Sequence, residues 1–148
     1  MSDTYLRYVP STPSFEPDRD VASRAEEFAR RAMVAESVAS MLAASVEFVD
    51  AGENWEGVRC PKCGADAESW WGDAMSSAAE HGFENLNVQA GCCGSQVGLD
   101  ELHYGWPVAF GRFVLEVANP TVRGMSEEQL NELGSILGCP VREVQCRV

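Results

Sequence analysis

Two cysteine pairs, separated by about thirty residues, constrain this chain more than any other feature of its sequence. Cys60 and Cys63 lie in the segment VRCPKCGADAES, and Cys92 and Cys93 lie in VQAGCCGSQVGL. Zinc prefers about four thiolate or imidazole ligands in a tetrahedron, and a C-x-x-C turn directs two sulfurs toward one point. A glycine follows each pair, and glycine tolerates the positive φ that such turns require. We therefore expect one zinc ion to join the two segments.

The second segment departs from the regular pattern. Ala90 stands where a second C-x-x-C turn would carry its first cysteine, and Cys92 and Cys93 are adjacent. Neighbouring side chains on an extended strand point to opposite faces, so both can bind one ion only if the chain turns there. Cys93 with its following glycine matches Cys63 and is the third expected ligand, with Cys92 as the fourth. The alternatives for the fourth ligand are His103, His81 and a water molecule.

Other interpretations of the cysteines are less well supported. Cys60 and Cys63 could form a thioredoxin-type redox pair, but that motif opens a helix directly after a strand. Here a glycine and two further cysteines follow, which favours a metal. An iron site also accepts four thiolates. Zinc is preferred because of the spacing of the cysteines, and because the sequence lacks the second group of cysteines that would suggest an iron–sulfur cluster protein. Cys139 and Cys146 lack a turn motif and are expected in the core.

Composition and charge limit the function. The 148 residues fit one domain, and the hydrophobic share of 45% is enough for an ordinary core. The net charge of −12 repels a nucleic-acid backbone and is compatible with high solubility or with a basic protein partner. No apolar run is long enough to span a membrane, and the first residues do not resemble a secretory signal, so we expect a cytoplasmic protein. In that compartment cysteines serve metal binding rather than disulfides.

The N-terminal third is predicted to form strand, helix and strand. Residues 4–9 are aromatic and β-branched, and apolar residues at helical spacing predict a helix from Arg19 to about residue 34, capped by Asp18 or Asp20. The segment that follows is ambiguous. Its alanines favour continued helix, whereas Val46 and Phe48 favour a strand over roughly 45–50.

The remaining segments have clearer signals. Residues 66–81 predict a helix capped by Asp66 and ended by Gly82, and residues 86–90 and 95–99 predict short strands on either side of the second cysteine pair. The final part again predicts strand, helix and strand: residues 111–120, a helix over 127–137 that Ser126 and Gln129 open with a capping box, and residues 140–148.

These elements predict a single α+β domain over residues 1–148. We expect one mixed or antiparallel sheet layer with helices on one face. Residues 55–100 would form a zinc-ribbon-like insertion within it.

The run FVDAGENWEGVRCPKCG, followed by WWGDAM, CCG and GRFVLEV-NP, resembles a group of uncharacterised small bacterial proteins that carry C-P-x-C-G and C-C-G elements. The similarity covers most of residues 4–148. The middle segment also resembles a zinc ribbon with a helix inserted between its two halves. The resemblance implies a metal site and a fold, but no activity.

Three functions are compatible with this sequence. The first is a non-enzymatic protein-interaction module with a structural zinc site of four cysteines, whose acidic charge would suit an immunity protein or an inhibitor of a basic target. The second is a zinc-dependent enzyme in which three thiolates leave one position open for water. The deaminase variant of that enzyme is not supported, because Gly82 and Phe83 follow His81 where an H-x-E motif would need a glutamate. The third is a thiol redox protein.

Overall fold

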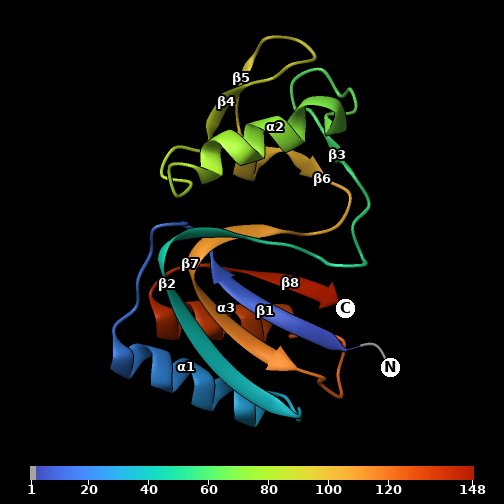
Figure 1. Cartoon of the computed structure of the whole chain (residues 1–148). Helices are drawn as coiled ribbons and strands as arrows, with labels where there is room; N and C mark the ends of the chain where they lie inside the picture. Colours follow the sequence, from blue (N-terminus) through green and yellow to red (C-terminus); the bar gives the residue numbers. More distant parts are fainter. Residues whose placement is uncertain (1–2) are drawn as a thin grey trace.

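The computed structural model describes residues 3–148, which form a four-stranded antiparallel sheet, three α-helices and two small two-stranded sheets (Figure 1). The main sheet has the strand order β2-β7-β1-β8. Its strands are β1 (Thr4–Pro10), β2 (Ser37–Val49), β7 (Ala109–Ala118) and β8 (Val141–Arg147). Helix α1 (Arg19–Ala32) connects β1 to β2, and helix α3 (Glu127–Leu137) connects β7 to β8.

The predicted α+β class is therefore confirmed, with an antiparallel main sheet. Each crossover helix leaves one strand and returns to a strand two places away in the sheet, which is the split β-α-β arrangement of ferredoxin-like topologies. Helices α1 and α3 pack against each other on one face of the sheet (Figure 1). The core between these helices and the sheet is formed by buried residues that include Leu6, Phe28, Leu115, Val117 and Leu133.

Local sequence signals explain where the two crossover helices begin and end. The Asp18 side chain accepts a hydrogen bond from the backbone N–H of Val21 at 2.8 Å and caps α1. Ser126 and Gln129 form the predicted capping box of α3, and Gly138 ends that helix with a φ of 89°. Because these caps satisfy backbone groups that the first and last helical turns leave free, both helices start where the sequence predicts.

A buried polar contact ties β1, β8 and the start of α3 together. The Tyr8 hydroxyl, which is fully buried, donates to a carboxylate oxygen of Glu143 at 2.9 Å. The same oxygen accepts from the backbone N–H of Met125 at 2.8 Å. Burial and the neighbouring carboxylate raise the pKa of Tyr8 well above its ordinary value, so its proton stays available for this hydrogen bond.

The chain between β2 and β7 forms a second unit, the cysteine module (residues 50–108), which lies above the main sheet in Figure 1. It contains β3 (Val58–Arg59), α2 (Glu68–Ala79), β4 (Asn87–Gln89), β5 (Gln96–Gly98), a 3-10 turn (Leu99–Glu101) and β6 (His103–Tyr104). The module has its own apolar core, to which the sheet contributes Val46 and Phe110 from the ends of β2 and β7.

The predicted module elements are present, with shifted boundaries. Strands β4 and β5 pair antiparallel around the second cysteine pair, as expected. Helix α2 is shorter than the predicted 66–81, and its N-cap is Ala67 rather than Asp66. The Asp66 carboxylate still accepts a hydrogen bond at 2.8 Å from the backbone N–H of Glu68, which is the first residue of the helix.

The ambiguous segment after α1 is a strand from Ser37 to Val49. Strand β2 begins at Ser37, eight residues before the predicted strand, and pairs with β7 from Ser37–Ala118 to Val49–Ala109, with an irregularity between Leu42 and Glu47. The helix preference of its alanines is weak, whereas β7 supplies a backbone partner along the whole segment. Tertiary pairing therefore decides this element.

Candidate metal centre

The first cysteine pair lies in a tight turn that follows β3. The backbone N–H of Cys60 donates to the carbonyl of Ala65 at 2.9 Å, and the N–H of Gly64 donates back to the carbonyl of Cys60 at 2.9 Å. Gly64 has a φ of 76°, a conformation that residues with a Cβ rarely adopt. The N–H of Lys62 lies 3.4 Å from the Cys60 sulfur, so the turn directs a backbone donor at a ligand atom.

The second turn, between β4 and β5, has the same two backbone hydrogen bonds as the first. The N–H of Ala90 donates to the carbonyl of Ser95 at 2.8 Å, and the N–H of Gly94 donates to the carbonyl of Ala90 at 2.7 Å. Gly94 has a φ of 75°. Ala90 therefore occupies the position that Cys60 has in the first turn, and Cys93 occupies that of Cys63. By the same correspondence, Cys92 occupies the position of Lys62.

The structure brings the four predicted ligands together although they belong to different turns. Their sulfur atoms all lie within 4.8 Å of one another, with Cys60 and Cys93 at 3.9 Å and Cys63 and Cys92 at 3.4 Å. Four sulfurs placed about 2.3 Å from a central zinc would be separated by about 3.8 Å. The four cysteines are therefore positioned to bind one metal ion.

The other cysteines and the histidines lie outside this cluster. Neither His81, in the turn after α2, nor His103, in β6, belongs to the group of four. Cys139 is buried at the end of α3 next to Ser11, and Cys146 is buried in β8. Both were expected in the core and are found there.

Backbone and hydroxyl donors in the two turns favour thiolates, which are the forms that bind metal. The backbone N–H of Cys63 lowers the pKa of Cys60 below its ordinary value. Hydrogen bonds from the hydroxyl and backbone of Ser95 lower the pKa of Cys93 to about 7. Desolvation of its sulfur, followed by contacts with Cys63 and Cys60, raises the pKa of Cys92 to about 12.

Trp70 covers the second turn and has an unused hydrogen-bond donor. A Cβ on Gly91 would lie 2.8 Å from the Cβ of Trp70. Trp70 therefore packs directly on this turn, and position 91 has room only for glycine. The indole N–H is buried and has no hydrogen-bond partner within residues 3–148. It is nevertheless close enough to Cys92 to lower the pKa of that thiol. A metal-bound Cys92 thiolate would be a suitable acceptor for this N–H, so the surroundings fit a metal.

Aromatic side chains connect the metal centre to the main sheet. Trp71, one position after Trp70, donates from its indole N–H to the Tyr104 hydroxyl at 3.2 Å, and that hydroxyl donates to the carbonyl of Leu99 at 2.7 Å. The rings of Trp55 and Phe48 lie 5.0 Å and 5.8 Å from the ring of Trp71. Because Phe48 belongs to β2, this cluster fixes the module on the end of that strand.

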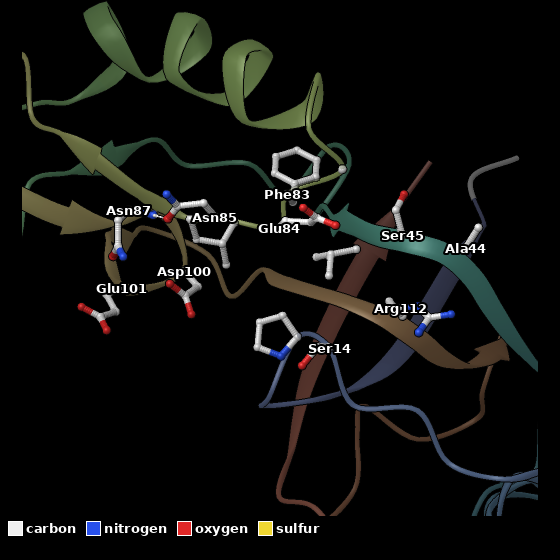
Figure 2. A pocket seen from close by; sticks show the side chains of 14 residues that line it. Ser14, Ala44, Ser45, Phe83, Glu84, Asn85, Asn87, Asp100, Glu101 and Arg112 are labelled. Carbon is white, nitrogen blue, oxygen red and sulfur yellow. Dashed lines mark hydrogen bonds between the residues drawn. The ribbon is translucent and has the colours of Figure 1, made fainter.

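A hollow of about 570 Å³ lies where the module meets the sheet. Figure 2 shows Glu84, Asp100 and Glu101 on its module side, and Arg112 and Ser14 on its sheet side. The charge of Arg112 is already paired, because its guanidinium contacts a carboxylate oxygen of Glu16 at 2.9 Å. None of the three module carboxylates forms a salt bridge within residues 3–148. Sequence reasoning did not find this hollow, because its walls come from five separate segments of the chain.

Comparisons of the chain with protein-family models, with curated proteins and with solved structures found no match. Within residues 3–148, no helix has the length and apolar character needed to cross a membrane.

Proposed function

We propose that this chain is a non-enzymatic protein-interaction module whose fold is stabilised by one zinc ion bound to Cys60, Cys63, Cys92 and Cys93. The observation that carries the proposal is the convergence of four sulfur atoms within 4.8 Å from two turns about thirty residues apart. Zinc is the metal that suits a tetrahedral set of four thiolates in such turns. A reducing compartment such as the cytoplasm would keep these thiols available.

A structural role is favoured over a catalytic one by the number of sulfurs. A catalytic zinc keeps one position open for water, whereas four sulfurs fill a tetrahedral sphere. The zinc would link the turn after β3 to the turn between β4 and β5, and so hold together a module whose strands have only two or three residues. Strands this short need an additional cross-link to be stable.

The charge of the molecule supports a basic protein as the partner. The net charge is −12, and the hollow at the foot of the module presents Glu84, Asp100 and Glu101 without a salt-bridge partner in the described chain. Unpaired carboxylates around a concave surface attract lysine and arginine side chains and steer association. An inhibitor or immunity protein directed at a basic target would use such a surface.

X-ray absorption spectroscopy of the purified protein tests the metal site. We expect one zinc per chain with four sulfur neighbours at about 2.3 Å. Cys139→Ser should leave the spectrum unchanged, because Cys139 lies outside the cluster, whereas Cys63→Ser should replace a sulfur by a lighter neighbour or release the metal. Three sulfurs and one oxygen in the unmodified protein would support the enzyme alternative, and a metal-free protein with a Cys60–Cys63 disulfide would support the redox alternative.

The partner is tested by affinity capture from the native host followed by mass spectrometry. We expect a basic protein that binds the unmodified chain and is lost when Glu84, Asp100 and Glu101 are changed to the neutral amides. A control with the same charge change at Asp20, Glu27 and Glu128, which lie on the exposed sides of α1 and α3, should retain the partner. Equal loss in both variants would show only general charge attraction and would argue against the hollow as the contact surface.

A further inference from the structure

The two edges of the main sheet are treated differently by this fold. The outer edge of β8 is covered by the chain around residues 51–54: the N–H of Glu53 donates to the carbonyl of Arg147 at 2.8 Å. The side chains of Asn54 and Trp106 both donate to the carbonyl of Gln145, at 3.1 Å and 3.0 Å. The outer edge of β2 has no pairing strand in the described chain. The carbonyl of Val38 in β2 accepts a long hydrogen bond of 3.5 Å from Arg30. Within the irregular part of β2, the carbonyl of Ala43 accepts from Arg112 at 2.9 Å.

The sequence of β2 lacks the features that usually block a free edge. Residues 37–46 contain no charge, proline or glycine. The irregularity in the strand begins only after Leu42, so residues 37–42 form a regular edge. Met41 and Leu42 point to opposite faces and are 51% and 47% exposed. Proteins normally protect a strand of this kind with lysines, prolines or a covering segment, because its backbone groups can pair with another chain.

A hollow beside this edge has room for side chains of an added strand. It lies between the first half of α1 and the middle of β2, measures about 530 Å³, and is lined in part by Leu42 and Phe113. Leu42 lies on the helix side of the sheet, as does Val38, which packs on the helix-covered core. An additional strand would therefore cover Met41 on one face and Leu42 on the other.

The charge around the edge distinguishes between possible occupants. Residues 19–46, which form α1 and most of β2, contain four arginines and four acids. Among the neighbouring acids Glu16 is paired with Arg112, so this flank has only the small excess charge of Asp18 and Glu47 in a molecule of −12. A basic partner would be drawn to the acidic surfaces elsewhere. A second copy of the chain, which is repelled by those surfaces, can approach this flank without that penalty.

From the free edge, its apolar side chains and the nearly neutral flank, we infer that β2 pairs antiparallel with β2 of a second copy about a twofold axis near Met41 and Leu42. The two main sheets then form one continuous eight-stranded sheet, with α1 of both copies on the same face. A twofold axis places the same surface on both sides of the interface, so the uncharged segment 37–46 of each copy supplies half of the contact. This interface is separate from the metal centre and from the hollow proposed for the basic partner.

Sedimentation equilibrium of the zinc-loaded full chain tests the inference. We expect a monomer–dimer equilibrium that Leu42→Lys weakens at least about tenfold, because each dimer then receives two like charges next to the axis. Val148→Lys makes the same change at a residue that is 55% exposed but distant from β2, and it should leave the equilibrium unchanged. A wild-type protein that stays monomeric up to millimolar concentration, or a dimer that survives Leu42→Lys, would overturn the assignment.

Hydrogen exchange of the unmodified protein provides a second test that does not depend on a variant. The backbone amides of residues 37–42 that face outward should be protected at high protein concentration and exchange faster on dilution, while the amides of β1 stay protected throughout. Protection of these amides that appears only when a different protein is added, and never with concentration alone, would assign the edge to that protein and overturn the second copy as occupant.

Discussion

At the scale of single residues, Ala90 shows how the metal centre differs from a regular zinc ribbon. The two turns have the same hydrogen bonds and the same positive φ at glycine, so Ala90 stands where a cysteine would complete a second C-x-x-C pair. Ala90 is buried, and the sulfur of Cys92, two residues further along the turn, reaches the cluster instead. The fourth thiol has therefore changed its position in the turn but still converges on the same point.

This correspondence predicts the effect of moving the thiol. Cys92→Ala should weaken zinc binding by more than about a hundredfold. Loss of a residue that only hydrogen-bonds to a metal ligand usually costs less than this, and Cys92 is expected to bind the metal itself. Ala90→Cys combined with Cys92→Ala should recover most of that affinity, because residue 90 has the backbone geometry of Cys60. Competition with a chromogenic chelator measures both. If the double variant binds zinc no better than Cys92→Ala alone, the two turns do not direct their first side chains equivalently.

At the scale of elements, local signals were sufficient wherever an element carries its own start and stop residues. Asp18, the Ser126–Gln129 capping box and Gly138 define α1 and α3 in the sequence and in the structure alike. Strands β4 and β5 were predictable because a glycine-bounded turn separates two short segments in which apolar residues alternate with polar or small ones. In each case the interaction that sets the boundary joins residues a few positions apart.

Strand β2 shows where local reasoning ends. Its residues 37–44 are mainly alanine and serine with a few larger apolar residues, and this composition does not distinguish helix from strand. The decisive interaction is pairing with β7, which lies about seventy residues away in the chain and on the other side of the cysteine module. No signal within the segment reports such a distant partner.

At the scale of the whole molecule, the chain has two large cores of different origin, beside a smaller buried cluster of Val9, Val49, Ala109, Val114 and Val144. The helix-covered sheet is held by large apolar side chains such as Leu6, Phe28 and Leu115, together with long strand pairings. The cysteine module has strands of two or three residues and relies on aromatic packing and on the proposed zinc ion. Val46 of β2 and Phe110 of β7 belong to the core of the module, so these two strands of the sheet contribute apolar side chains to it.

This division predicts the response to metal removal. A strong chelator should increase amide exchange in the module, most of all in residues 58–67 and 87–98, because the ion joins these two turns. Residues 4–10 and 109–118 should remain protected, since their core contains no cysteine ligand. Hydrogen exchange followed by mass spectrometry measures both regions in one experiment. Uniform loss of protection across the chain would mean that the sheet also depends on the metal.

The sequence by itself determined the four thiols, the boundaries of α1 and α3, the α+β class and the acidic character of the molecule, because each follows from residues close together in the chain or from composition. The tertiary structure decided three other features: the convergence of Cys92 on the cluster, the full length of β2, and the free edge that this strand presents. Each of these depends on which distant segments lie side by side. That arrangement is set by the packing of the whole chain, and short sequence patterns do not encode it.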